Sequence, residues 1–307
     1  MIAALFDFDN DGAMSDWDES RVEHHEAKLP EVRLHYAAMG PEDGPLVVLL
    51  HGFPEFWYSW RHQMGPLADA GYRVVAPDMR GYNISEKPAG VAAYRTPKLT
   101  GDVAALIRHL GRESAVVGGH DWGAVVAWLF AQEYPELLVK LVIMNVPHPV
   151  AFRSRFFQGW QFLKSWYVFA FQVPWMVEIV AKITGFYTFR HIFRNDPVNP
   201  MAFSEEDIRR YMEALRQPGA LTAAVNYYRA AFRDMLMGRL PPPKVIERPV
   251  LVLWGERDAY LGRHLAEPPA EWVPDCRLVR FPDASHWVQV DVADDVNASM
   301  LDFLDLV

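Results

Sequence analysis

The chain has 307 residues, of which 51% are hydrophobic and 22% are charged, and its formal net charge is -9. This size and apolar content predict one large core with room for an inserted second lobe. The acidic balance argues against nucleic acid or an anionic membrane as a partner. The single cysteine, Cys276, excludes an internal disulfide and favours a reducing compartment, so we expect a cytoplasmic protein.

The first 28 residues are acidic and polar, and we expect them to form a solvated leader. The opening MIAALFDFDND has no basic segment and too short an apolar run for a signal peptide, and no later run is long enough for a membrane span. Residues 7–12 carry the calcium-loop pattern D-x-D-x-D-G, but Asp18 stands where such loops have glutamate, and too few residues precede the pattern for a helix. The sequence therefore predicts no metal site.

Short apolar runs alternate with helix-like segments along most of the chain. The predicted strands are 32–39, 45–50, 72–77, 114–119, 138–145, 248–255 and 276–282, the first of them antiparallel. The predicted helices are 57–71, 99–111, 122–134 and 292–307, and Gly71 and Gly111 stand where helix ends favour glycine. This alternation predicts an α/β fold with a mostly parallel sheet.

The alternation stops after residue 147 and resumes near residue 240. The intervening segment is helical in pattern and rich in aromatic residues, and three prolines, 241–243, follow it. A helical insertion between two strands is expected to cover the carboxyl edge of the sheet, where open α/β sheets bind ligands. The sequence thus predicts a leader at 1–28, a core at 29–147 and 240–307, and a cap at 148–239.

The stretch VVGGHDWGAVVAW, residues 116–128, puts Asp121 on a turn between a strand and a helix. The flanking Gly119 and Gly123 predict a sharp turn that holds the side chain above the sheet, and the helix N-terminus favours a negative charge. A carboxylate suits attack on a saturated carbon, which gives an ordinary ester, better than acyl transfer, which gives an anhydride. A simple helix-capping role for Asp121 is the alternative.

Two further stretches complete a catalytic pattern. HGFPE, residues 51–55, follows a strand, so the backbone amides of Phe53 and Trp122 are expected to form an oxyanion hole, a plain turn being the alternative. DASHWVQVD contains His286, the predicted general base, which Asp258 in WGERDAY would orient. The order nucleophile, acid, histidine is the order of α/β hydrolases.

Taken together, HGFPEFWYSWRHQ, PDMRGYNISEKP, GGHDWGAVVAW, SWYVFAFQVPW, NYYRA and SHWVQVD resemble the α/β-hydrolase-fold epoxide hydrolases, from about residue 29 to the end. The resemblance implies an α/β-hydrolase fold with an inserted helical cap and a two-step ester mechanism without a cofactor. It assigns Asp121 as the nucleophile, His286 as the base and Asp258 as its partner. The substrates would be an apolar epoxide and water, with Phe53, Pro54 and Trp122 against the epoxide.

The resemblance also implies two tyrosines of the cap, Tyr167 and Tyr228, as the groups that hold the epoxide oxygen. Two phenol donors would stabilise the developing alkoxide and supply one proton. Tyr227 competes with Tyr228 for this role, but adjacent helical residues do not share a face, so only one should point inward. The alternative is that these rings only pack in an aromatic lid.

Two other functions remain open at this point. Haloalkane and haloacetate dehalogenases use the same aspartate nucleophile, but fluoroacetate dehalogenases have a histidine-tryptophan pair where this chain has Tyr167 and Val168, and arginine in place of Trp122. Many haloalkane dehalogenases carry the acid after the next strand, where this chain has Asn145. A non-catalytic binding protein on the same fold is the second alternative. A homo-oligomer is compatible with the sequence.

Overall fold

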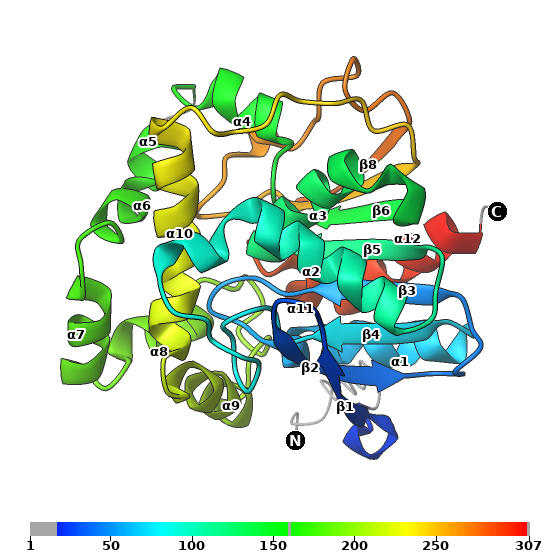
Figure 1. The fold of residues 1–307 in the computed structure, drawn as a ribbon, viewed down its shortest axis with the longest axis horizontal. Helices are drawn as coiled ribbons and strands as arrows, with labels where there is room; N and C mark the ends of the chain where they lie inside the picture. The colour runs from blue at the N-terminus through cyan, green and yellow to red at the C-terminus, as the bar shows by residue number, and fades with distance from the viewer. Residues whose placement is uncertain (1–16, 159–160, 306–307) are drawn as a thin grey trace, which may run out of the picture.

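The computed structural model describes residues 17–158 and 161–305, and these residues form an eight-stranded sheet covered by helices (Figure 1). The strands are β1 (Glu23–Lys28), β2 (Arg33–Met39), β3 (Leu46–Leu50), β4 (Arg73–Pro77), β5 (Ala115–His120), β6 (Leu138–Met144), β7 (Val250–Gly255) and β8 (Cys276–Phe281). Their order across the sheet is β1-β2-β4-β3-β5-β6-β7-β8. Only the β1–β2 and β2–β4 pairs are antiparallel, which confirms the predicted mostly parallel sheet with an antiparallel strand at its start.

Five helices belong to the core: α1 (Arg61–Asp69), α2 (Thr96–His109), α3 (Trp122–Glu133), α11 (Val288–Asp291) and α12 (Ala293–Asp305). α2 begins three residues earlier than predicted, because Pro97 lies in its first turn, where a missing N–H costs no hydrogen bond. The predicted helix 57–71 is a 3₁₀ turn, Trp57–Trp60, followed by α1. Gly71 and Gly111 follow the helix ends with φ of 91° and 69°, as expected for terminating glycines.

Strand β3 divides the core into two layers. All five of its residues are buried, and their side chains alternate between the faces of the sheet. Val48 and Leu50 join the apolar cluster that contains side chains of α2 and α3, whereas Val47 and Leu49 join the cluster of α1 and α12. A strand buried on both faces needs a continuous apolar run, which is why LVVLL was recognisable in the sequence.

The leader was wrongly extended to residue 28. Residues 17–28 are described, and β1 (Glu23–Lys28) pairs along its whole length with β2 at the edge of the sheet. Only Ala27 of EHHEAK is buried, so the strand lacks the apolar alternation by which strands are recognised. The calcium-loop pattern at residues 7–12 lies outside the described residues, and Asp18 accepts hydrogen bonds from Ser20 at a 3₁₀ turn.

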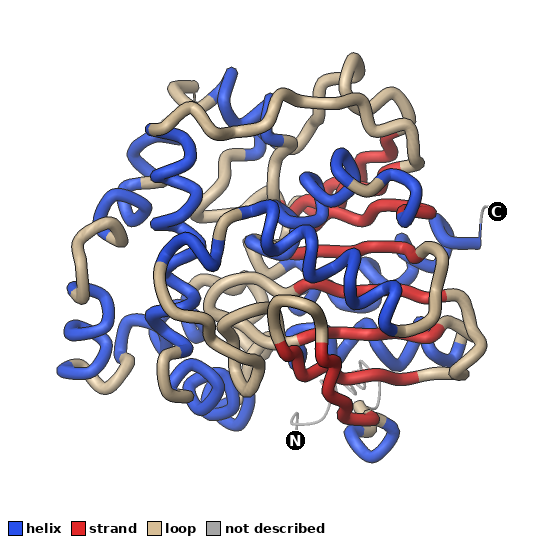
Figure 2. Tube along the Cα trace, in the orientation of Figure 1, coloured by secondary structure: helices blue, strands red, loops and turns tan. Residues whose placement is uncertain are grey.

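The helices between β6 and β7 gather at the carboxyl ends of the parallel strands (Figure 2). They are α4 (Pro149–Arg155), α5 (Gln161–Lys164), α6 (Trp166–Ala170), α7 (Met176–Ile183), α8 (Tyr187–Asn195), α9 (Glu205–Arg216) and α10 (Ala220–Leu236). This run lies within the segment predicted as the cap. None of the described helices combines the length and hydropathy needed to cross a bilayer.

Candidate active site

Asp121 occupies the one-residue turn between β5 and α3. Its backbone has φ 47° and ψ -121°, a strained conformation for a residue with a side chain. A Cβ on Gly119 would lie 2.5 Å from the backbone of Gly123, and a Cβ on Gly123 would lie 2.0 Å from the carbonyl oxygen of Leu50. The close approach of β5, α3 and β3 therefore requires both glycines, for the reason that the sequence pattern indicated.

The loop after β3 supplies a backbone donor to Asp121. The amide of Phe53 donates to Oδ1 of Asp121 at 2.7 Å. A Cβ on Gly52 would lie 2.4 Å from the Cβ of Asp121, so the loop backbone packs directly against the carboxylate. Trp122 is the first residue of α3, where a backbone amide has no intrahelical acceptor. Pro54, the third residue expected against the substrate, is buried next to Phe53.

His286 lies between the carboxylates of Asp121 and Asp258. It follows β8 in the loop before α11, and its Nδ1 is 2.8 Å from Oδ2 of Asp258, whereas its Nε2 is 3.6 Å from Oδ2 of Asp121. All three residues come from loops at the carboxyl edge of the sheet. The fold thus brings together side chains that are up to 165 positions apart in the sequence.

Charges in this triad stabilise one another. Burial alone would raise the pKa of Asp121, but the contact with His286 and the Phe53 amide outweigh burial and lower the pKa. Burial alone would lower the pKa of His286, but Asp258 and Asp121 raise it to about 10. Asp258 is buried as well, and its pKa is nevertheless lowered by His286 and by its hydrogen bonds. The resting site therefore holds an imidazolium between two carboxylates.

Asp258 is fixed by donors that the sequence reasoning did not identify. The amides of Tyr260 and Leu261 donate to its Oδ1 at 2.7 and 2.8 Å, and Nδ2 of Asn145 donates to its Oδ2 at 2.8 Å. Oδ1 of Asn145 in turn accepts the amide of Gly255 at 2.8 Å. The only sequence signal is that Asn145 ends the strand after Asp121, where many haloalkane dehalogenases carry the acid.

A second buried pair, His120 and Glu55, contacts the backbone of His286. Nδ1 of His120 is 2.8 Å from Oε2 of Glu55, and its Nε2 is 2.9 Å from the carbonyl oxygen of His286. Both partners are acceptors, so each ring nitrogen of His120 faces an acceptor oxygen, and His120 and Glu55 form a buried pair. Burial alone would raise the pKa of Glu55, but the charge of His120 lowers it. Both residues lie within the sequence motifs HGFPE and GGHDWGAVVAW, but neither motif predicts this pairing.

Two phenol rings from the cap face the loops that carry Phe53 and Asp121, which we call the catalytic loops. The ring of Tyr228 on α10 lies 4.9 Å from that of Trp122 and 5.4 Å from that of Phe53, between ring centroids. The ring of Tyr167 on α6 lies 5.9 Å from that of Tyr228. Burial and the charge of Asp121 raise the pKa of both tyrosines, which keeps their hydroxyls protonated as hydrogen-bond donors.

The hydroxyl of Tyr227 points away from this site. It donates to the carbonyl oxygen of Arg80 at 2.8 Å, whereas the ring packs against Tyr82 and Tyr94 and lies 5.5 Å from that of Trp122. The two adjacent tyrosines of α10 therefore face different surroundings, as the helical geometry required.

Tyr260 is a third phenol near the triad that the sequence reasoning missed. Its ring centroid lies 5.2 Å from that of His286 and 6.0 Å from that of Tyr167. Its hydroxyl donates to the carboxylate of Asp196, which follows α8 in the cap. Tyr260 thus connects the loop of Asp258 to the cap.

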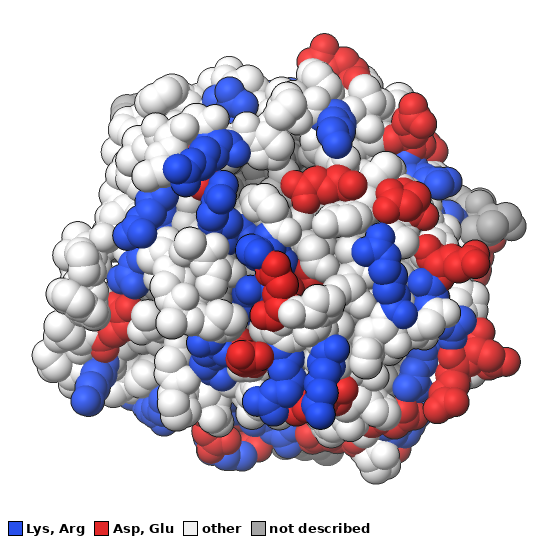
Figure 3. Space-filling model, in the orientation of Figure 1, with Lys and Arg blue, Asp and Glu red and all other residues white. Residues whose placement is uncertain are grey.

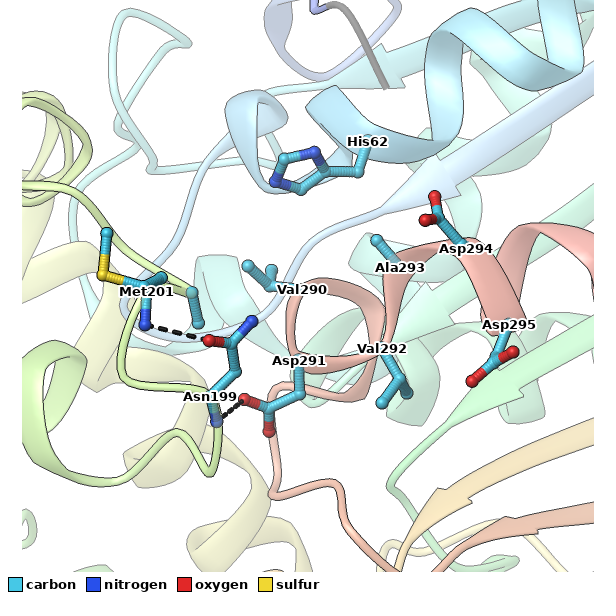
Figure 4. Close-up of a pocket in the computed structure, with 10 residues that line it drawn as sticks. His62, Asn199, Met201, Val290, Asp291, Val292, Ala293, Asp294 and Asp295 are labelled. Carbon is cyan, nitrogen blue, oxygen red and sulfur yellow. Dashed lines mark hydrogen bonds between the residues drawn. The ribbon is translucent and has the colours of Figure 1, made fainter. Parts of the chain in front are cut away.

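The pocket shown in Figure 4 lies apart from the triad, between α1, the loop around Asn199 and the start of α12. Asp291, which lines this pocket, accepts the amide of Asn199 at 3.0 Å and the amide of Ser285 at 2.7 Å. This carboxylate therefore ties a cap loop to the residue before His286. Among the described residues, no group of three or more His, Cys, Asp or Glu side chains is placed to bind a metal ion.

Known proteins resemble the chain over most of its length. The sequence family described as alpha/beta hydrolase fold matches residues 45–293. The AB hydrolase superfamily protein YfhM of Bacillus subtilis (strain 168) is 44% identical over 275 residues, which cover 89% of this chain and 94% of that protein. Epoxide hydrolase 1 of Caenorhabditis elegans is 38% identical over 293 residues, which cover 94% of this chain and 70% of that protein. The crystal structure of Bacillus megaterium epoxide hydrolase in complex with an inhibitor superposes with a TM-score of 0.82 at 31% identity, over 92% of this chain and 100% of that chain.

Proposed function

The chain belongs to the epoxide hydrolases of the α/β-hydrolase fold, and we propose that its conversion of epoxides into vicinal diols runs through an ester on Asp121. The observation that carries this mechanism is the environment of the Asp121 carboxylate. Phe53 donates to Oδ1, whereas Oδ2 lies 3.6 Å from Nε2 of His286, beyond hydrogen-bond distance. One oxygen is therefore held by the backbone while the other is free to attack a carbon atom.

In the first step, Asp121 attacks an epoxide carbon and the carbon–oxygen bond of the ring breaks. The electron pair of that bond goes to the epoxide oxygen, which takes a proton from one of the two cap tyrosines, Tyr167 or Tyr228. Two hydroxyl donors stabilise the charge as it develops. The products are a hydroxyalkyl ester on Asp121 and a tyrosinate.

Ester formation prepares the base for the second step. It removes the negative charge of Asp121, which is one of the two charges that raise the pKa of His286 to about 10 in the free site. The pKa of His286 falls, and in the overall proton balance the proton that it gives up replaces the one lost by the tyrosine. A neutral imidazole then stands beside the ester, oriented by Asp258.

In the second step, His286 takes a proton from water, and the resulting hydroxide attacks the ester carbonyl carbon of Asp121. The amides of Phe53 and Trp122 stabilise the tetrahedral oxyanion. The bond between the acyl carbon and the alkyl oxygen breaks, and the diol leaves with the remaining proton of the water. Asp121 is again a carboxylate and His286 again an imidazolium, so no cofactor enters the balance.

Apolar aryl or alkyl epoxides fit the aromatic surroundings of the site, which include Phe53, Trp122, Phe171 and the two tyrosines. We further propose a cytoplasmic location, since the chain has one cysteine and burial raises the pKa of the Cys276 thiol to about 11, which keeps it protonated and unreactive. A homo-oligomer stays a prediction.

The mechanism is tested by one turnover in water labelled with heavy oxygen, with enzyme in excess over styrene oxide. Hydrolysis of an Asp121 ester puts the label into the enzyme, and the first diol carries none. Peptide mass analysis should find the label in the peptide that contains Asp121. Label in the first diol would mean direct attack by water on the epoxide and would overturn the ester mechanism. A separate assay with haloalkanes tests the dehalogenase alternative.

A further inference from the structure

The outer surface of the cap exposes large apolar side chains that no described residue covers. Trp175 is 71% exposed, Phe157 82% and Ile183 80%. We call the surface that carries Phe157, Trp166, Trp175, Ile179, Ile183 and Leu236 the apolar cap face. It follows α5, α6 and α7 along one edge of the molecule and reaches the end of α10, where Phe169 of α6 packs on Phe232 (Figure 1). Exposed apolar patches of this kind mark interaction surfaces.

The same segment is basic in an otherwise acidic chain. Residues 148–195 contain six lysines or arginines and one acidic residue, Glu178, although the whole chain has a net charge of -9. Arg229 pairs with Glu178 at 3.0 Å and neutralises it. In Figure 3 the edge over α5–α7 is mostly uncharged, with scattered basic side chains and one acidic group, whereas acidic side chains interspersed with basic ones are more frequent toward the opposite edge.

Several of these basic groups are available to a partner. Arg153, Lys182 and Arg190 form no ion pair with another described residue, and neither does the exposed Arg233 near the end of α10. Lys182 lies on α7 within one turn of Ile179 and Ile183. Lys182 therefore borders exposed aliphatic side chains, and the guanidinium of Arg190 lies 3.8 Å from the position of a Cβ on Gly185, just after α7.

We propose that the apolar cap face docks on the surface of an anionic phospholipid bilayer. Exposed tryptophan and aliphatic side chains enter the boundary between headgroups and acyl chains, and the bordering basic groups pair with anionic headgroups. The occupant is a lipid surface rather than an acidic protein, because the face is mainly apolar and its charges lie at the border. The prediction of no membrane partner used the net charge, which averages over two oppositely charged regions of the chain.

The docking face and the active site share helix α6. Its Trp166 belongs to the apolar cap face and its Phe169 is also exposed, whereas Tyr167 between them faces Tyr228. A bilayer that dissolves apolar epoxides would thus deliver them next to the tyrosines. This step rests on the proposed function, but the docking itself does not.

The test is flotation of the purified full chain with two kinds of vesicle, phosphatidylcholine alone and phosphatidylcholine mixed with phosphatidylglycerol. The protein is expected to float with the anionic vesicles and to be released by high salt. Trp175→Ser with Ile179→Ser should weaken binding at least about tenfold. Lys182→Gln and Arg190→Gln should each weaken it about fivefold. None of these changes should alter turnover of dissolved styrene oxide.

Matched controls lie on the core. Ile84→Ser replaces an aliphatic side chain that is 55% exposed, and Arg108→Gln removes an exposed basic group of α2; both should bind vesicles like the unchanged protein. Equal loss of binding in these controls, or no flotation with anionic vesicles, would overturn the proposal. So would a dimer in sedimentation that Trp175→Ser with Ile179→Ser dissociates, since a second copy would then cover the face. Because flotation needs no catalysis, failure of docking is distinguishable from failure of the ester mechanism.

Discussion

In the proposed mechanism, loss of His286 separates the two chemical steps. It contacts Asp121 but is needed as a base only after the ester has formed, so His286→Gln should trap the ester. Turnover should fall roughly 100-fold or more. Intact-mass analysis should find the variant heavier by one substrate molecule, whereas Asp121→Asn should gain nothing. Absence of the adduct on an otherwise folded variant contradicts the assignment of His286.

The adjacent tyrosines of α10 provide a matched comparison at the residue scale. Tyr228→Phe and Tyr167→Phe each remove one donor to the developing alkoxide, so ester formation should slow about 100-fold. Tyr227→Phe removes a hydrogen bond to the carbonyl oxygen of Arg80 and should cost about 1 kcal/mol of unfolding free energy without changing that rate. Rapid-quench kinetics of ester formation check this prediction. A larger effect for Tyr227→Phe than for Tyr228→Phe would reverse the assignment.

At the scale of elements, the turn between β5 and α3 depends on how closely α3 approaches β3. Gly123→Ala places a Cβ 2.0 Å from the carbonyl oxygen of Leu50, so the helix must move. We expect a loss of about 3 kcal/mol or more of unfolding free energy and of most activity. Denaturant unfolding and a styrene oxide assay measure the two effects.

The control for this prediction is Gly101→Ala within α2. The nearest atom to its added Cβ is the hydroxyl of Tyr134, at 3.8 Å, so the methyl group fits. Alanine is the better helix former, and the variant should gain about 1 kcal/mol. If Gly101→Ala lost as much unfolding free energy as Gly123→Ala, the loss at Gly123 could not be attributed to its close contact with Leu50.

For the whole molecule, the raised pKa of His286 predicts how stability depends on pH. The native state keeps a proton up to a pKa of about 10, whereas the unfolded chain releases it near 6.5. The stabilisation is therefore fully present below pH 6.5 and is lost as the pH rises through the native pKa, by up to about 1.4 kcal/mol per pH unit. Denaturant titrations across this range should show the decline, and His286→Gln should flatten it. Equal slopes for both proteins would refute the raised pKa.

The element pattern and the central turn were determined by the sequence itself. Strands such as LVVLL are buried on both faces, and a turn such as Gly119 to Gly123 needs its glycines for local steric reasons, so both appear as local patterns. Epoxide hydrolase motifs then predicted Asp121, Asp258 and His286 as the nucleophile, acid and histidine, in chain order. These features can be predicted from the sequence because they depend on residues that are close together in the chain.

Tertiary structure alone decided which distant groups meet. It added β1 to the sheet, although EHHEAK has one buried residue, because pairing with β2 uses backbone groups rather than apolar side chains. It also put Glu55 against His120 and Asn145 against Asp258, and turned Tyr228 rather than Tyr227 toward the catalytic loops. Such contacts depend on how separate elements pack, and no short stretch of sequence records that packing.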